Sequence, residues 1–256
     1  MSYDFSNEVK LFMVFDILGD MERSGSVQWR VKRERLEDIK DHILDLILMS
    51  RILRKHFSIE IDYDKMTDYI ICHDLPEAIT GDITKFEGVS DEEITRVTNL
   101  AIEYLSSKFE NIMDFKTIIN GYEDRVDIES KITKMLDKVS SAFAFIKYQS
   151  EKNIDVDDPE IMPVLRNHPF VVEKIAEGKD VADIFYEFHM KAINITDEEC
   201  DKYGIKRDVA DEIEDTIRGF TKELYKQKLD GTLLKVSEDF PKDAMEYNSN
   251  IEDNNK

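Results

Sequence analysis

Glycine, proline and cysteine are all scarce in this sequence of 256 residues, which holds 9 glycines, 5 prolines and 2 cysteines. Sandwiches, barrels and propellers need many tight turns and are therefore disfavoured, whereas a chain rich in Glu, Lys, Leu and Ile favours helix. Cys72 and Cys200 are too few for a disulfide framework and neither lies in a C-x-x-C pair, which favours reduced thiols. We expect an all-α protein.

Long apolar runs are also missing, and basic residues are far fewer than acidic ones. No stretch is long enough to cross a bilayer, and the first residues lack the basic start and apolar run of a signal peptide. The 35 Lys and Arg stand against 56 Asp and Glu, a formal charge of −21, which should repel nucleic acids and anionic membranes. We expect a cytoplasmic protein that binds neither.

Apolar residues at helical spacing predict most of the secondary structure. Ser90 with Glu93, and Thr196 with Glu199, have the spacing of capping boxes at helix starts. Pro76 and Gly81 predict a turn-rich connection after residue 73. The predicted helices cover residues 5–18, 38–53, 65–73, 90–105, 128–148, 163–176, 181–193 and 209–229.

Three segments differ in character along the chain. Residues 1–150 carry the strongest helical patterns and are expected to form the core, with helices of residues 151–235 packed on it as a C-terminal extension. Residues 236–256 are polar and acidic, which is typical of a disordered tail. Residues 23–35 hold five basic residues against one acidic residue, and this is where an anion is expected to bind.

Two histidines and two aspartates on three predicted helices have unusual positions. His42 and His73 lie on apolar faces, His73 is followed by Asp74, and Asp137 stands beside the apolar stripe of its helix among small residues. A single histidine on an apolar face is more often a core residue than a ligand. Together, however, these four buried groups would each be costly alone, and one divalent cation would satisfy them all. The ligand types suit Mn²⁺, Fe²⁺, Co²⁺ or Zn²⁺.

The same residues carry a family resemblance. The pattern His42 … His73-Asp74 … Asp137 resembles the signature of the HD superfamily of metal-dependent phosphohydrolases. The segment HDLPEAITGD, residues 73–82, is similar to that of the bacterial 5′-deoxynucleotidases and their relatives, as are Trp29 and the R-x-E-x-I-x-D-H segment of residues 35–42. The likeness covers residues 5–148.

The resemblance implies a helical HD bundle that hydrolyses small nucleotides, most simply a deoxynucleoside 5′-monophosphate to the nucleoside and phosphate. One divalent transition metal would be held by the two histidines and two aspartates, Glu77 would activate the attacking water, and Asp82 would contact the sugar or water. Trp29 would pack beside the deoxyribose. A homodimer is the oligomeric state that the resemblance favours.

Several alternatives stay open at this point. A triphosphate hydrolase of the same fold and a nucleotide-binding protein without turnover would carry the same ligands. Glu77 and Asp82 could be turn residues, Trp29 a core anchor, and the basic stretch an exposed helix start. Because Gln28 stands where the deoxynucleotidases have arginine, the phosphate must be held by another basic residue of the stretch, and we expect Arg30, Arg33 and Arg35 to contribute. Arg23 and Lys32 are the other candidates.

Overall fold

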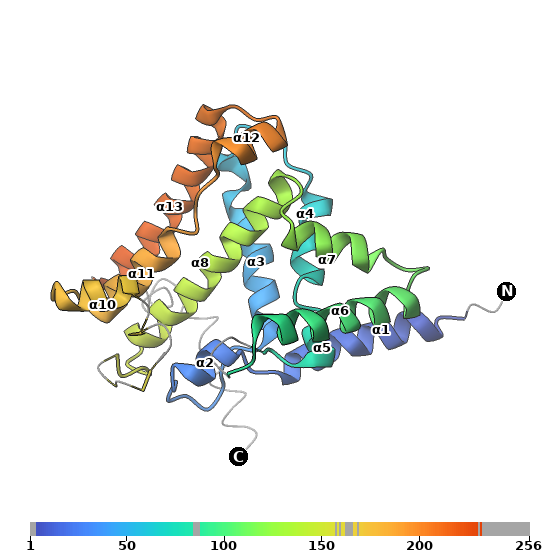
Figure 1. Ribbon diagram of the computed structural model, residues 1–256, viewed down its shortest axis with the longest axis horizontal. Helices are drawn as coiled ribbons and strands as arrows, with labels where there is room; N and C mark the ends of the chain where they lie inside the picture. The colour runs from blue at the N-terminus through green and yellow to red at the C-terminus, as the bar shows by residue number, and fades with distance from the viewer. Residues whose placement is uncertain are drawn as a thin grey trace, which may run out of the picture.

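The computed structural model describes residues 4–83, 88–156, 158, 160–161, 166–167, 169–229 and 231, and these form helices joined by short connections (Figure 1). The only β pairing among these residues is one isolated antiparallel bridge between Glu22 and Asp38. The predicted all-α fold is therefore confirmed. The predicted tail of residues 236–256 lies outside the described residues. No described helix is both long enough and apolar enough to cross a bilayer.

The helices follow the predicted ranges closely, with four further α-helices between them in the described residues. The elements are α1 (Ser6–Ile17), the 3-10 turn η1 (Leu18–Asp20), α2 (Ser24–Gln28), α3 (Ile39–Leu53), the 3-10 turn η2 (Arg54–His56), α4 (Tyr63–Cys72), α5 (Glu77–Thr80), α6 (Asp91–Lys108), α7 (Phe115–Glu123), α8 (Ile128–Ser150), α10 (Pro169–Ala176), α11 (Val181–Met190), α12 (Asp197–Tyr203) and α13 (Arg207–Leu229). The helices α2, α5, α7 and α12 have no counterpart in the predicted ranges, although α12 begins at the capping box predicted for Thr196 and Glu199. Within residues 163–176, helix α10 begins at Pro169.

Side-chain caps fix where helices α3 and α6 begin. Asp38 caps α3 by accepting the backbone N–H of Asp41 at 2.8 Å, and Asp41 returns the contact as a capping box. Ser90 accepts the N–H of Glu93 at 3.2 Å, so α6 begins where the sequence predicts. The cap at Asp38, one turn before His42, sets the start of α3 so that this histidine lies on the apolar face of the helix.

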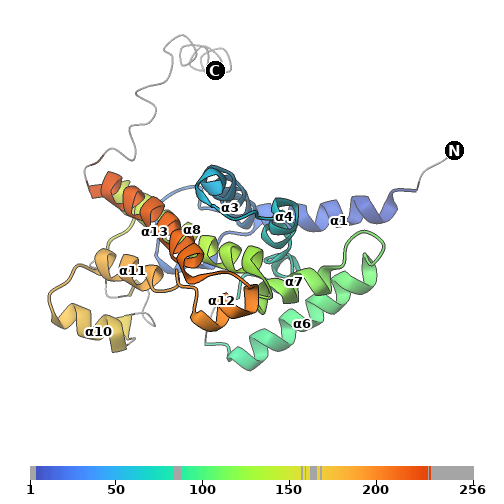
Figure 2. The ribbon, with the colours of Figure 1, turned by 90° about the horizontal axis from the view of Figure 1, so that it is seen from above.

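Helix α8 runs through the centre of the molecule. It packs against α3, α4 and α7 on one side and against α11 and α13 on the other (Figures 1 and 2). Leu136 and Val139 of α8 are fully buried, and the hydrophobic core that contains them also includes Ile213 and Ile217 of α13. Each such side chain contributes about 1.5–3 kcal/mol to stability on burial. One apolar core thus joins helices from both halves of the chain.

The core helices bring the predicted polar residues to one place. His42 lies in the first turn of α3, His73 immediately follows α4, and Asp137 lies near the middle of α8. All three are less than a tenth exposed. Because α8 packs directly on both α3 and α4, their side chains meet in the interior.

His189, near the end of α11, is partly buried among aromatic rings. Its ring centroid lies 4.1 Å from that of Phe185, and its Nδ1 donates to the Phe185 carbonyl oxygen at 2.9 Å. Burial lowers the pKa of His189 to about 4. Since an unfolded histidine has a pKa of about 6.5, the unfolded chain binds a proton between pH 6.5 and 4 that the native protein does not bind.

We therefore expect the free energy of unfolding to decrease as the pH falls from 6.5 to 4, with a contribution from His189 of at most about 3 kcal/mol. Urea unfolding between pH 7 and 4.5 measures this. His189→Asn, which keeps a donor for the Phe185 carbonyl, should show a shallower dependence, and His56→Asn at an exposed position should behave as wild type. Parallel pH profiles for wild type and His189→Asn would contradict the assignment.

Candidate metal centre

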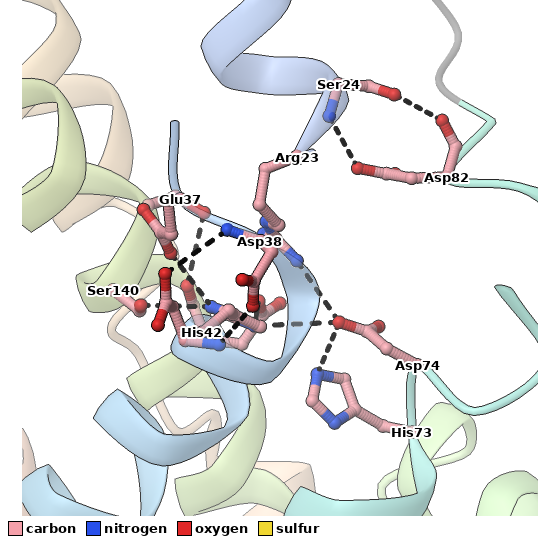
Figure 3. A network of polar contacts seen from close by, with 12 residues as sticks. Arg23, Ser24, Glu37, Asp38, His42, His73, Asp74, Asp82 and Ser140 are labelled. Atoms are coloured by element: carbon pink, nitrogen blue, oxygen red, sulfur yellow. Dashed lines mark hydrogen bonds and ion pairs between the residues drawn. The ribbon is translucent and has the colours of Figure 1, made fainter. Parts of the chain in front are cut away.

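Three side chains from three helices converge on one small volume. His42, His73 and Asp137 each offer a ligand atom, and these atoms all lie within 4.8 Å of one another. The Nε2 atom of His42 is 3.4 Å from Asp137 Oδ1. Figure 3 shows His42 and His73 turned toward the carboxylate of Asp74, which lies between them.

The imidazole of His42 is held on its far side. Its Nδ1 lies 3.0 Å from the hydroxyl oxygen of Ser140, one turn beyond Asp137 on α8. Burial, together with the charge of Arg23, lowers the pKa of His42 to about 4, so the ring is neutral. A neutral imidazole with Nδ1 engaged presents the lone pair of Nε2, which is the form that binds metals.

His73 has the same arrangement through a backbone contact. Its Nδ1 donates to the carbonyl oxygen of Ile70 at 2.8 Å, which fixes the tautomer and leaves Nε2 directed into the cluster. That Nε2 lies 3.2 Å from Asp74 Oδ2. The contact to Ile70 exists because His73 follows the last turn of α4, where a side chain can reach a free carbonyl.

Asp137 is buried and one of its two oxygens is already engaged. Oδ2 accepts from the hydroxyl of Tyr122 at 3.3 Å and from the ammonium of Lys138 at 3.0 Å, whereas Oδ1 faces His42. Although burial alone would raise it, the neighbouring Lys138 and His42 hold the pKa of Asp137 well below its ordinary value. The group is therefore a carboxylate.

Asp74 connects this cluster to the basic stretch. Its Oδ2 accepts from Arg23 Nη1 at 3.1 Å and lies 3.7 Å from His42 Nε2 (Figure 3). Against the effect of burial, His73 and Arg23 lower the pKa of Asp74, which is ionised as a result. Arg23 itself stands just before α2, and the bridge between Glu22 and Asp38 holds this segment beside the start of α3.

Two buried nitrogen atoms for which the structure describes no hydrogen-bond partner indicate that these side chains fit a divalent metal. Among the described residues, Nε2 of His42 and Nε2 of His73 are buried polar atoms with no hydrogen-bond partner. Leaving two buried nitrogen atoms unpaired costs about 1–3 kcal/mol each. Both nitrogens point at the carboxylates that would complete a site, so a cation bound there would satisfy them.

A third unpaired atom lies next to the cluster. Oε2 of Glu77, in the short helix α5, is buried and has no hydrogen-bond partner in the described part of the chain. Burial, with the negative charges of Asp74 and Asp82, raises the pKa of Glu77 well above its ordinary value. A carboxylate with a raised pKa beside a metal site is typical of a general base.

Asp82 joins the connection after α5 to the basic stretch. Its Oδ2 accepts the backbone N–H of Ser24 at 2.7 Å, and the Ser24 hydroxyl donates to the Asp82 carbonyl (Figure 3). Gly81 before it has φ +80°, a conformation that a side chain would strain. Because Ser24 follows Arg23, these contacts also hold the guanidinium in place.

A cavity of about 460 Å³ opens beside the cluster, between α5, α6 and α7. His73, Asp74 and Glu77 form its inner end, and polar side chains of α6 and α7 line the rest, including Asn99 and Asn120. Its described lining holds four carboxylates and no lysine or arginine. The volume suits a ligand of nucleoside size.

The structure does not bring the other predicted substrate residues to this cluster. The indole of Trp29 is buried against Phe145 and Phe185, with ring centroids 5.3 Å and 5.7 Å away, in an aromatic core between α8 and α11. This is the core-anchor alternative that the sequence left open. Apolar burial and edge-to-face packing explain why the ring prefers this place.

The basic side chains expected to hold phosphate are engaged elsewhere. Arg30 pairs with Asp158 and Glu160, Arg33 with Glu151, and Arg35 with Asp38 and Asp41. All three are more than two-fifths exposed. Their acidic partners lie either far along the chain or at the start of α3. Within the described residues, Arg23 is the basic residue of this stretch that contacts a residue of the cluster.

Several residues around the cluster have no role predicted from the sequence. Ser140 and Tyr122 contact ligand side chains, and Oε1 of Glu37 lies 4.0 Å from Nδ1 of His42. Burial raises the pKa of Glu37 to about 7. The Arg-x-Glu pair of the R-x-E-x-I-x-D-H segment was a signal for Glu37, whereas Tyr122 lies in α7, for which no helix was predicted.

Comparisons with known proteins agree with this geometry. The profile of a family described as HD domain matches residues 15–176, which is more than half of the chain. The protein named 5′-deoxynucleotidase HDDC2 of Xenopus laevis is 23% identical over 144 residues, which cover 54% of this chain and 69% of that protein. The 5′-deoxynucleotidase YBR242W of Saccharomyces cerevisiae is 27% identical over 143 residues, 52% of this chain and 58% of that protein. The human HDDC2 protein is 21% identical over 175 residues, 65% of this chain and 83% of that protein.

Proposed function

Because the chain belongs to the HD-domain family, we propose that it is a metal-dependent phosphohydrolase that converts deoxynucleoside 5′-monophosphates to deoxynucleosides and phosphate. The observation that carries this proposal is the convergence of His42, His73 and Asp137, with buried, unpaired nitrogen atoms, next to the unpaired carboxylate of Glu77. The relatives named 5′-deoxynucleotidase support the substrate class.

In this proposal the two histidines, Asp74 and Asp137 hold one divalent transition metal, of which Mn²⁺, Fe²⁺, Co²⁺ and Zn²⁺ all suit the donor set. When bound, such a metal lowers the pKa of water and polarises phosphoryl oxygens. Ser140 and the Ile70 carbonyl hold the two imidazoles so that each Nε2 faces inward. Tyr122 and Lys138 occupy Oδ2 of Asp137, which leaves Oδ1 as the ligand atom.

Glu77 accepts the proton of the attacking water at Oε2, the buried atom that lacks a partner. Its raised pKa suits this role because a stronger base takes the proton more readily near neutral pH. Arg23 binds the substrate phosphate, since its guanidinium contacts Asp74 and its side chain is only 19% exposed. Asp82 keeps Arg23 in position through Ser24, and its contact with the sugar or water stays a prediction.

Charge favours a monophosphate over a triphosphate. With the phosphate between Arg23 and the metal ligands, the nucleoside lies in the adjoining cavity of about 460 Å³. A chain of two further phosphates in that cavity would meet its carboxylates, including Glu123 and Asp124, without a lysine or arginine of the described lining to offset them. A neutral sugar and base avoid this repulsion.

A metal-by-substrate panel tests the proposal. Each of the four metal ions is added to chelator-treated protein and crossed with mono-, di- and triphosphates of ribo- and deoxynucleosides, and released phosphate is measured. We expect turnover only with added metal and the highest kcat/KM for deoxynucleoside monophosphates. Release of tripolyphosphate would instead support a triphosphate hydrolase. Metal-dependent nucleotide binding without phosphate release would support a binding protein.

Three further features expected from the sequence stay predictions. One is the boundary of the core at residue 150, which the family match passes, since it extends to residue 176. Another is the cytoplasmic location. The third is the homodimer, which the exposed apolar side chains of neighbouring helices α1 and α3 support; they include Phe12, Ile17 and Leu48.

A further inference from the structure

Lys138 is a second cation at the cluster, where it contacts Asp137. Its ammonium lies 3.0 Å from Asp137 Oδ2, and its side chain is 41% exposed although the carboxylate it contacts is buried. Arg23, the other cation at the cluster, contacts Asp74 at 3.1 Å. Lys138 and Arg23 therefore each pair with one of the two predicted carboxylate ligands.

One cation is too little for the substrate charge at this site. A phosphate monoester carries close to two negative charges at neutral pH. A bound divalent metal would be balanced by the charges of Asp74 and Asp137. Arg23, the residue of the basic stretch that contacts the cluster among the described residues, then offsets only one of the two phosphate charges. A second positive group would offset the other.

Lys138 has both the freedom and the position for this. An ammonium has three N–H donors, and the contacts described for Lys138 engage Asp137 alone. Consecutive residues of a helix point about 100° apart, so the side chain of Lys138 bends toward Asp137 to make this contact. Because the side chain is 41% exposed while its ammonium contacts a buried carboxylate, a phosphate oxygen that enters from solvent can meet it.

We propose that Lys138, which contacts Asp137, binds the substrate phosphate together with Arg23, which contacts Asp74. This inference rests on the proposed function, since it concerns the phosphate of the same substrate. It also gives the residue after the last metal ligand a role that neither the sequence motif nor the resemblance assigns. Arg23 and Lys138 would favour a terminal phosphate, with its two charges, over a phosphodiester with one.

Binding of inorganic phosphate to metal-loaded protein, measured by calorimetry, tests the inference without turnover. Lys138→Gln is expected to weaken phosphate binding and to raise KM for a deoxynucleoside monophosphate about tenfold or more, with a smaller change in kcat. Lys138→Arg keeps the charge and should retain most of the affinity. Lys134→Gln is the matched control, because Lys134 lies one turn earlier on α8 and contacts Glu123 and the Tyr122 ring instead.

The metal affinity of each variant separates this role from a structural one. If Lys138 only neutralised Asp137, Lys138→Gln would change the metal Kd and leave the phosphate Kd as in wild type, and the inference would be overturned. A wild-type protein that binds phosphate through Lys138 but hydrolyses no deoxynucleotide would refute the proposed function while the inference stands. Turnover with an unchanged KM in Lys138→Gln would refute the inference alone. Circular dichroism confirms that each variant is folded.

Discussion

Asp74→Ala is expected to lower kcat/KM for a deoxynucleoside 5′-monophosphate on the order of 10⁴-fold or more, while helical content stays as in wild type. The carboxylate of Asp74 lies between the two histidines and is the partner of Arg23, so its loss removes a ligand and releases the phosphate-binding arginine at once. Because His73 and Asp74 follow α4 and do not form its apolar face, the fold does not depend on them.

Two measurements make the Asp74 result specific. Metal content after dialysis should fall well below one ion per chain in Asp74→Ala, and His73→Ala should behave in the same way. Asp64→Ala, on the exposed first turn of the same helix, is the control and should keep both metal and activity. Normal turnover with a full metal complement in Asp74→Ala would show that the ligands are assigned wrongly.

Glu77→Gln should lower kcat by about 10²–10⁴-fold with little effect on metal content, because it removes the proton acceptor and preserves the shape of the side chain. The buried Oε2 of Glu77 has no partner in the described part of the protein, so an amide at this position breaks no existing hydrogen bond of that atom. Stopped assays of phosphate release measure the loss, and metal analysis of the same samples shows that the site is intact.

Glu123→Gln is the matched control for this variant. Glu123 lines the same cavity but is 57% exposed and pairs with Lys134, so its replacement should change kcat less than threefold or so. If Glu77→Gln retained wild-type kcat, Glu77 would be a turn residue as the sequence alternative allows, and another group would have to take the proton.

Helical periodicity predicted that His42, His73 and Asp137 lie in the interior, and the structure brings these three together. His42 occupies an apolar position in the long helix α3, and His73 follows α4 at the helical spacing of its apolar residues. Asp137 lies among small residues on a helix that is covered on both sides. A polar residue at such a position stands out from its pattern. The caps at Asp38 and Ser90 involve residues only three positions apart, so the starts of α3 and α6 could also be predicted from the sequence.

The substrate residues were harder to predict because tertiary contacts decide them. The sequence places Arg23, Arg30, Arg33 and Arg35 in one basic stretch, and nothing local distinguishes them. Arg30 meets Asp158 across 128 residues of sequence, and Arg33 meets Glu151 across 118, whereas Arg23 is directed inward by the pairing of Glu22 with Asp38. Trp29 packs against Phe145 and Phe185, which belong to helices far away in the sequence, and not beside the cluster.

The central position of α8 ties the chemistry of this protein to its C-terminal half. The helix carries Asp137, Lys138 and Ser140, and the side opposite α3 and α4 is covered by α11 and α13. Without these later helices, the apolar flank of the helix that carries Asp137 would be exposed to water. We therefore expect the two halves of the chain to unfold as one cooperative unit, with a single transition in urea.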